Sequence, residues 1–330
     1  MIPIDNIGNR LDLLSQEYLA MLKRYFNFNT PPRKKNKLSK VFHRKKSLEY
    51  NMLRHFEGNI DKIILAKPNE LLNIENAFRF TLKINDSDAQ HKKKLTIFKE
   101  RMGHYYSDFF SKPYDPSDVE HTIGRWLSSK IDLKVCPYCN HNYTLTVSDR
   151  KNKINFRPDF DHFYPKSIYP ILALSFYNLI PSCAVCNKLK GSKLIKYSPY
   201  LLKKDDIKFE LYGVGEDEKP KLLGLGESSN KILVKPVYSA KSTSTECNLG
   251  TLGIEQIYGH QVDYVEEIIA KTQRYNQDFF CEMVKSYNGL GKTEAEIDRI
   301  IWGAYLDDHT KRPLSKLTND VLIQLGIKQA

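Results

Sequence analysis

The chain has 330 residues, of which 41% are hydrophobic and 27% charged, and its formal net charge of +12 gives a sequence pI of about 9.2. This length accommodates two ordinary domains, and no apolar run approaches the roughly 18 residues of a membrane span. The first residues lack the basic start, apolar middle and cleavage site of a signal peptide, so we expect a cytoplasmic protein without a membrane span. The positive charge favours a polyanionic partner, most simply nucleic acid, although a solvated basic surface would carry the same charge.

Helical patterns dominate the first 130 residues. Apolar residues recur every three or four positions over residues 10–26 and again between 48 and 127, so we expect a helical N-terminal region at 1–130. A basic arm at 33–46 lies between these stretches and carries eight Lys or Arg and no acid. It is either a solvated loop or a phosphate-contacting arm. Its candidate nucleic-acid-binding residues are Arg33, Lys34, Lys35, Lys37, Arg44, Lys45 and Lys46.

The hydrophobic periodicity changes in the middle of the chain. Residues 142–149 alternate apolar and polar side chains, as a half-buried strand does, and 154–163 form a second strand candidate. An apolar stretch then leads into a short helix predicted at 187–194, with a weak end at Gly191. We therefore predict a small α+β module at 131–196.

The C-terminal region, 197–330, has a mixed pattern. Strand patterns at 207–214 and 231–239 flank an acidic loop that contains glycine. Helical patterns return after residue 257 and continue almost to the end of the sequence. The sequence therefore predicts the α+β class, as a mostly helical chain with a central small module and a short C-terminal sheet.

Four of the six cysteines form two C-x-x-C pairs, which are typical of tetrahedral zinc sites. Two intervening residues let both sulfurs of a pair face one ion about 2.3 Å away. The alternative is a redox C-x-x-C, but such a motif usually occurs singly. A site closed by four thiolates has no open position for water, so we predict a structural zinc rather than a catalytic one. Its predicted ligands are Cys136, Cys139, Cys183 and Cys186, whereas Cys247 and Cys281 stand alone.

Residues between the two cysteine pairs suggest phosphodiester hydrolysis. This reaction needs a base for water, a divalent cation to stabilise charge on the phosphate, and hard oxygen ligands for that cation. His162 is the candidate base, because imidazole accepts protons near neutral pH. Asp161 and the amide oxygen of Asn187 are the candidate ligands of a catalytic Mg²⁺ or Mn²⁺. Each residue alone would more simply be structural, so it is their shared position inside one zinc-stapled unit that indicates a site.

Three further polar residues complete the candidate site. Asn178 can bond the backbone or the imidazole and hold His162 in place, while Lys190 and Lys166 can meet phosphate. Neighbouring residues on a regular strand point to opposite faces. Asp161 and His162 therefore serve one site only if their strand bends or ends there.

The stretches "CPYCN", "FDHFYPKS" and "YPILALSFYNLIPSCAVCNKLKG" resemble the HNH endonucleases with zinc knuckles, the ββα-metal nucleases. The resemblance covers Val135 to Leu194. It implies that the motif positions are held by Asp161, His162, Asn178 and Asn187, the last being a common variant of a His. It also implies hydrolysis with Mg²⁺ or a similar ion that leaves a 5′-phosphate and a 3′-hydroxyl, with DNA expected before RNA as substrate. The expected central module is then a zinc-stapled ββα-metal (HNH) unit.

The phrases "HFYPKS" and "LSFYNLIPSC" resemble a narrower group, the HNH proteins of Septu-type bacterial anti-phage systems, which work beside an ATPase encoded next to them. This resemblance implies a role in antiviral defence and an ATPase protein partner. Two alternatives remain open: a non-catalytic zinc-finger protein that binds nucleic acid, and a structural subunit of a larger complex. The zinc-finger alternative would not need Asp161, His162 and Asn187 together.

Overall fold

The N-terminal region is helical, as its apolar periodicity predicts. A computed structural model of the chain describes residues 1–5, 9–27, 47–115, 117–149, 151–152, 154–215, 220–224, 227, 229, 231–238, 246–274 and 277–328. The N-terminal elements are α1 (Arg10–Phe26), α2 (Leu48–Gly58), α3 (Ile60–Leu65), α4 (Leu71–Thr81), α5 (Ala89–Ser111), the strand pair β1 (Pro113–Asp115) and β2 (Asp118–Thr122), and α6 (Ile123–Ile131).

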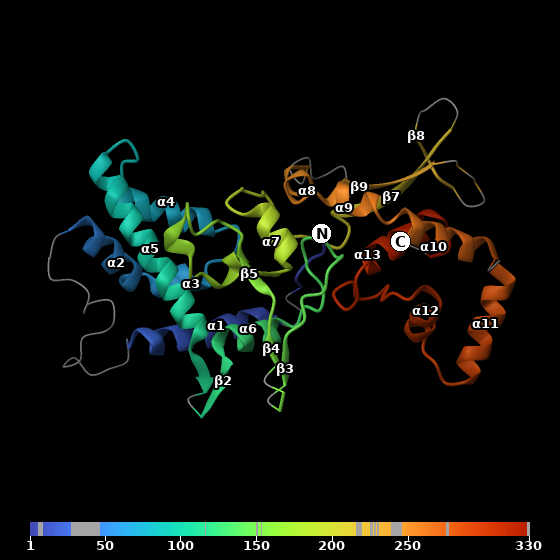
Figure 1. Cartoon of the computed structure of the whole chain (residues 1–330), viewed down its shortest axis with the longest axis horizontal. Coiled ribbons are helices and arrows are strands. Elements are labelled where there is room, and N and C mark those ends of the chain that lie inside the picture. The colour runs from blue at the N-terminus through green and yellow to red at the C-terminus, as the bar shows by residue number, and fades with distance from the viewer. Residues whose placement is uncertain are drawn as a thin grey trace.

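Aromatic side chains fill the space between these helices. Tyr18 of α1 is fully buried, and its ring meets Phe109 of α5 edge-on at 5.5 Å between centroids. Phe26 meets Tyr105 in the same way at 5.2 Å. Edge-on aromatic pairs fix the relative placement of the two helices. The long helix α5 is thereby held against α1 and runs toward the centre of the molecule, where it packs on the central region (Figure 1).

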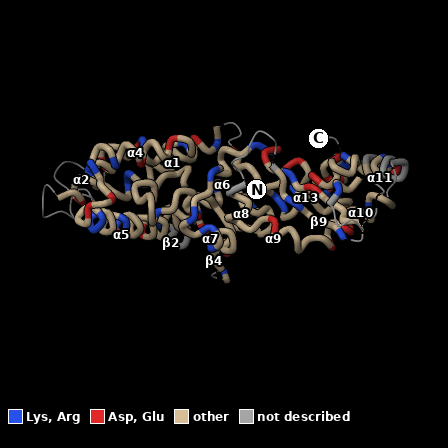
Figure 2. The backbone as a smooth tube through the Cα atoms, turned by 90° about the horizontal axis from the view of Figure 1, so that it is seen from above, with Lys and Arg blue, Asp and Glu red and all other residues tan. Residues whose placement is uncertain are grey.

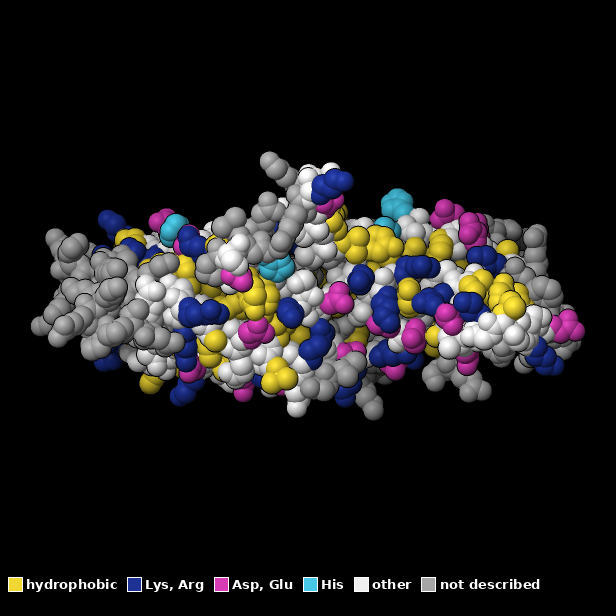
Figure 3. Space-filling view, turned by 90° about the horizontal axis from the view of Figure 1, so that it is seen from below, with side chains coloured by type: hydrophobic (Ala, Val, Ile, Leu, Met, Phe, Trp, Pro, Cys, Tyr) yellow, Lys and Arg dark blue, Asp and Glu magenta, His cyan; other side chains and the backbone are white. Residues whose placement is uncertain are grey.

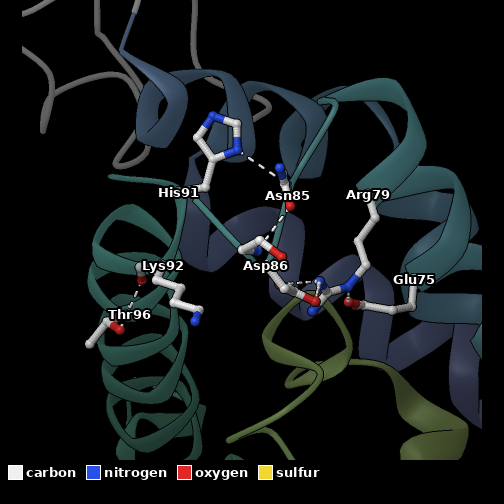
Figure 4. Close-up of polar contacts among 8 residues, drawn as sticks. Glu75, Arg79, Asn85, Asp86, His91, Lys92 and Thr96 are labelled. Atoms are coloured by element: carbon white, nitrogen blue, oxygen red, sulfur yellow. Dashed lines mark hydrogen bonds and ion pairs between the residues drawn. The ribbon is translucent and has the colours of Figure 1, made fainter. Parts of the chain in front are cut away.

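Polar contacts fix the turn between α4 and α5 (Figure 4). The guanidinium of Arg79 donates to the buried Glu75 at 2.6 Å and to both carboxylate oxygens of Asp86 at 2.8 and 2.9 Å. The backbone N–H of Asn85 donates to Nδ1 of His91 at 3.0 Å. These contacts anchor the first turn of α5, so the helix is held at its start as well as along its length.

The central region consists of short antiparallel strand pairs and a short helix. The pair formed by β3 and β4 projects from the molecule, whereas the second pair, β5 and β6, lies inside it with α7 packed on β5 (Figure 1). The elements in chain order are β3 (Val147–Asp149), β4 (Ile154–Phe156), β5 (Asp159–His162), the 3-10 turns η3 (Pro170–Leu172) and η4 (Phe176–Asn178), β6 (Leu179–Ser182) and α7 (Ala184–Lys190).

Two strand predictions need correction here. The predicted strand at 154–163 is two strands, because Pro158 has no N–H to donate and interrupts the ladder between them. The predicted strand at 142–149 contributes only its last three residues to β3. Near the start of this predicted strand, Tyr143 instead forms an isolated β-bridge with Val135, beside the first cysteine pair.

The C-terminal region combines a three-stranded antiparallel sheet with helices. The sheet has the order β8-β7-β9, and α13 packs on β7. Because β8 pairs only with the last three residues of β7, part of this edge of β7 has no partner strand among the described residues. Side chains of α13 take its place: Asp320 accepts the N–H of Phe209, and Gln324 accepts that of Leu211, both at 2.9 Å. The elements are β7 (Ile207–Val214), β8 (Pro220–Leu222), β9 (Lys231–Tyr238), α8 (Glu246–Leu252), α9 (Ile254–Gly259), α10 (Val262–Arg274), α11 (Gln277–Gly289), α12 (Glu294–Trp302) and α13 (Ser315–Gln324).

The molecule is elongated, with the N-terminal helices at one end, the C-terminal sheet and helices at the other, and the central region between them (Figures 1 and 2). The predicted α+β class is confirmed: about half of the chain is helical, and the sheets are small and antiparallel. Basic and acidic residues are interspersed over the described residues, from one end of the molecule to the other (Figure 2). Among the described helices, none is both long and apolar enough to cross a membrane.

Candidate functional site

Four cysteine thiols lie together in the central region. The Sγ atoms of Cys136, Cys139, Cys183 and Cys186 all lie within 4.8 Å of one another, and all four residues are buried. A tetrahedral zinc with thiolates at about 2.3 Å separates its sulfurs by about 3.8 Å. The sulfurs of Cys139 and Cys183 are 4.0 Å apart. The cluster can therefore hold a metal ion such as zinc, as the spacing of the cysteines predicts.

Hydrogen-bond donors surround the sulfur of Cys183. The side-chain amide of Asn142 and the backbone N–H of Cys186 each lie 3.4 Å from it. Such donors stabilise the thiolate, which is the form that binds a metal. Burial and four sulfur ligands together suit a structural ion.

The turn after the first cysteine pair is anchored to the C-terminal region. Asn140 has a φ of 51°; its Nδ2 donates to the carbonyl of His309 at 2.7 Å, and its Oδ1 accepts the N–H of Lys316 at 3.0 Å. The hydroxyl of Tyr258 donates to the carbonyl of Cys139 at 2.6 Å. The segment "DDHTKRPLSK" and α9 therefore support the cysteine cluster, a role that the sequence pattern did not indicate.

Asp161 has a buried carboxylate with two neighbouring donors. The hydroxyl of Tyr138 donates to its Oδ2 at 2.7 Å, and the ammonium of Lys190 lies 3.1 Å from Oδ1 and 3.0 Å from Oδ2. Burial raises the pKa of Asp161 and lowers that of Lys190, and in each case the charge of the other residue opposes the shift. Asp161 and Lys190 therefore form a buried ion pair at the end of α7.

His162 is held by the loop that follows its strand. Its Nε2 lies 3.0 Å from the carbonyl oxygen of Ala173, and Tyr106 of α5 packs edge-on at 4.7 Å between ring centroids. Because a carbonyl only accepts, Nε2 carries the proton, and in the neutral ring Nδ1 is then the basic nitrogen. Burial, reinforced by the charge of Lys166, lowers the pKa of His162 to about 3. The imidazole is therefore neutral near pH 7, and a pKa this low also makes it a weaker proton acceptor than an ordinary imidazole.

The side chains of Asp161 and His162 have different partners, as neighbours on a regular strand do. The carboxylate meets Tyr138 and α7, whereas the imidazole meets α5 and the loop after η3. The strand β5 ends at His162. A ligand that contacts both side chains would therefore lie at this end of the strand.

Asn178 is fully buried, and its side chain bonds backbone groups of the described residues. Its Oδ1 accepts the N–H of Tyr164 at 2.7 Å, and its Nδ2 donates to the carbonyls of Tyr164 and Leu172, both at 3.0 Å. Leu172 immediately precedes Ala173, whose carbonyl holds the imidazole. Asn178 thus fixes the loop around His162 without touching the ring. Of the two predicted partners of Asn178, the backbone and the imidazole, it bonds the backbone.

Asn187 lies beside an acid that the sequence interpretation missed. Its Nδ2 donates to Oδ2 of Asp159 at 3.2 Å. Asp159 precedes Asp161 by two residues and shares its strand face, and this spacing is the signal that could have identified it. The structure therefore places Asn187 beside Asp159 and Lys190 beside Asp161. Among the described contacts there is none between Asp161 and Asn187.

The other predicted basic residues differ in placement. Nζ of Lys166 lies 4.4 Å from the centroid of the Tyr106 ring, on the α5 side of His162. The basic arm at 33–46 lies outside the described residues. Tyr106 itself comes from a helix more than fifty positions upstream of His162, so no local pattern could have assigned it to the site.

A groove runs between the β3–β4 pair and the start of α7. Its lining includes Tyr143, Phe156, Arg157 and Asp159. The two aromatic residues are 55% and 50% exposed, which is unusual for rings of this size. The guanidinium carbon of Arg157 lies 5.4 Å from the ring centroid of Phe160. The groove thus presents flat aromatic faces and one cation next to Asp159.

The oxygen donors around β5 suit a hard divalent cation by chemical type. Mg²⁺ and Mn²⁺ prefer carboxylate and amide oxygens, and Mg²⁺ typically takes one or two carboxylates and keeps several waters. Asp161, Asp159 and the amide of Asn187 provide such atoms, although Lys190 already neutralises Asp161. Within the described ranges, the cysteine cluster is the only group of three or more His, Cys, Asp or Glu side chains close enough to share an ion.

Comparison with known proteins identifies no relative of this chain: no family model, no curated protein and no solved structure matches it. The geometry of the central region and the resemblance of its motifs are therefore the grounds for assigning a function.

Proposed function

We propose that the chain is a metal-dependent HNH endonuclease that hydrolyses nucleic-acid phosphodiester bonds. The observation that supports this most is the arrangement of β5, β6 and α7. The strand that carries Asp161 and His162 pairs with the strand that leads into the second cysteine pair, and α7 returns onto it. DNA is the expected substrate, and RNA is the alternative.

His162 acts as the general base in the proposed reaction. Its Nδ1 accepts a proton from the attacking water, and the contact from Nε2–H to Ala173 keeps the ring in the required tautomer. Asn178 holds the loop that carries this carbonyl. A divalent cation, with Asp161 and Asn187 among its ligands, would supply positive charge next to the scissile phosphate.

The groove beside the β3–β4 pair is the proposed path of the nucleic acid. Exposed Tyr143 and Phe156 offer faces on which bases stack, and Arg157 offers a charge for phosphate. On the face shown in Figure 3, Lys and Arg side chains alternate with acidic and hydrophobic ones across the described residues. In the proposal, nucleic acid is therefore bound both by base stacking in the groove and by phosphate contacts. The basic arm at 33–46 contributes further phosphate contacts.

We extend the proposal, on the resemblance to Septu-type proteins, to an antiviral defence effector that acts with an ATPase partner. An unrestrained nuclease would damage its own cell, so a partner that controls it fits the chemistry. Co-purification of the native protein with an ATPase encoded beside it tests this extension. A chain that cuts at full rate alone, and that recovers no ATPase, would remove it.

A zinc-dependent nucleic-acid binder that does not cut is the second candidate. The observation that favours it is the buried pair of Lys190 and Asp161, because a neutralised carboxylate attracts a cation weakly. This candidate shares the cysteine cluster and the groove with the nuclease. It differs in predicting binding without metal-dependent cutting.

A cutting assay with variants of His162 separates the two candidates. We expect the parent to cut DNA with Mg²⁺ or Mn²⁺ and His162→Ala to cut about 10² to 10⁴ times more slowly, the usual contribution of a positioned base. The matched control is His260→Ala, because His260 is exposed and lies far along the chain at the end of α9. The assay includes the ATPase if one co-purifies. A parent that binds DNA but does not cut it with either ion would overturn the nuclease proposal, and folded, zinc-containing His162→Ala that cuts at the parental rate would remove His162 from the mechanism.

A further inference from the structure

The ammonium of Lys190 is enclosed at the candidate site. The residue is 0% exposed, and its Nζ contacts both carboxylate oxygens of Asp161 and donates to the carbonyl of His162 at 2.6 Å. An ammonium has three N–H donors and no acceptor. Two of these contacts are hydrogen bonds, to Oδ1 of Asp161 and to the carbonyl of His162, and the third is an ion-pair contact with Oδ2, so in this conformation the ammonium is committed to β5.

The end of α7 places Lys190 at this position. The helix ends at Lys190, and the next residue, Gly191, has a φ of +49°, a conformation that L side chains rarely adopt. The N–H of Gly191 donates to the carbonyl of Asn187 at 2.9 Å and closes the last turn. The lysine stem runs into the interior, toward β5, where the residue is fully buried and its ammonium contacts Asp161. The contact with Asp161 is thus part of the fold rather than the chance position of a surface side chain.

We propose that Lys190 is an internal counter-ion that competes with a divalent cation for the carboxylate of Asp161. The inference rests on the proposed function, because it describes the control of the cation site of that nuclease. An ionised carboxylate has about four lone-pair positions, and hydrogen bonds from Tyr138 and Lys190 use one on each oxygen of Asp161. A carboxylate neutralised by an ammonium also has little net attraction for a second cation.

This competition couples cation binding to substrate binding. In the free protein Lys190 keeps Asp161 neutralised, so a cation that binds must displace the ammonium. A phosphate of bound nucleic acid offers the displaced ammonium new acceptors and offers the cation another oxygen ligand. Each ligand then promotes the binding of the other, as linkage requires. The site takes up its cation mainly when nucleic acid is present.

Binding of Mn²⁺ to the full, zinc-loaded chain tests the proposal without using activity. The free Mn²⁺ concentration is measured by electron paramagnetic resonance. Lys190→Met keeps the length of the side chain and removes its charge, so we expect Mn²⁺ affinity to rise by on the order of tenfold or more. The matched control is Lys188→Met, because Lys188 is exposed on the same helix, and it should bind Mn²⁺ as the parent does. The added affinity should vanish when Asp161→Asn is combined with Lys190→Met.

Amine labelling of the parent gives a second readout that does not depend on how a variant folds. Addition of saturating Mn²⁺ without nucleic acid should raise acetylation of Lys190 several-fold relative to Lys188, measured by mass spectrometry, because the displaced ammonium then has no phosphate to bind. Equal Mn²⁺ affinities of parent and folded Lys190→Met would overturn the proposal. So would a gain that survives Asp161→Asn, or Lys190 labelling that ignores the cation. If the parent cuts DNA with Mg²⁺ but shows any of these results, the nuclease proposal stands and this inference is lost.

Discussion

His309 shows how burial and neighbouring charges set the charge of a single residue. It is 6% exposed, and its Nε2 has no hydrogen-bond partner among the described residues. Burial first, and then the charges of Lys316 and Lys204, lower its pKa to about 4, while Asp308 acts in the opposite direction. The imidazole is therefore neutral in the folded chain at pH 7, and it packs beside the turn that follows the first cysteine pair.

We predict that His309→Gln makes the stability of the chain less sensitive to acid. His309 protonates near its ordinary pKa of 6.5 in the unfolded chain but only near pH 4 in the folded one. The unfolded chain therefore binds more protons between these values, and the stability due to this residue is complete above pH 6.5 and lost as the pH falls toward 4. Chemical denaturation of parent and variant between about pH 7 and about pH 5 measures the two slopes.

The difference between the two pH slopes of the free energy of unfolding reports on His309, because parent and variant carry the same cysteines and acids. The parent should lose free energy of unfolding more steeply as the pH falls. A variant whose slope equals that of the parent would show that His309 protonates normally in the folded state.

At the scale of elements, the sequence predicts best where local contacts decide the structure. The predicted helix at 10–26 and strand at 207–214 agree with α1 and β7, because a buried apolar stripe or alternation defines each. The helix predicted at 187–194 is observed at Ala184–Lys190. It begins earlier than predicted because the sulfur of Cys183 caps it, and it ends earlier because Gly191 terminates it.

Contacts between distant elements leave no periodic signal. Tyr106 reaches His162 only because α5 packs against the loop between β5 and β6. Asn140 reaches His309 only because the C-terminal segment folds back onto the central region. The cysteine pairs and the Asp-His pair could be identified in the sequence because their residue types carry a specific chemistry. Their neighbours could not, since a tyrosine or an asparagine has many other uses.

The groove beside the β3–β4 pair carries a prediction of its own. If bases stack on the exposed rings that line it, Tyr143→Ser and Phe156→Ser should each weaken binding of single-stranded DNA by about 1–3 kcal/mol, the usual worth of one base on an aromatic ring. Fluorescence anisotropy with a labelled oligonucleotide measures this. Phe80→Ser is the control, because Phe80 is 87% exposed on α4, away from the groove. Equal losses in all three variants would mean that exposed apolar area, and not the groove, determines binding.

At the scale of the whole molecule, several parts of the chain meet at the first cysteine pair. The N–H of Ile2 donates to the carbonyl of Pro137 at 2.8 Å, and the hydroxyl of Tyr258 donates to that of Cys139. Asn140 holds the N-terminal end of α13 through the N–H of Lys316. The knuckle therefore connects the beginning of the chain, α9 and α13, which lie far apart in sequence.

We predict that removal of the metal loosens the C-terminal half as well as the central region. The purified chain should contain one zinc, because four thiolates complete one tetrahedral site. Binding and folding are coupled at such sites, so a strong chelator or Cys139→Ser should unfold the turn that holds Asn140. Hydrogen exchange measured by mass spectrometry should then show lost protection in α13 along with residues near Cys139. Protection in α1 and α5 should persist, because aromatic packing rather than the knuckle holds those helices. A folded chain without zinc would refute the metal site, and unchanged protection of α13 after zinc loss would show that the C-terminal region folds independently of it.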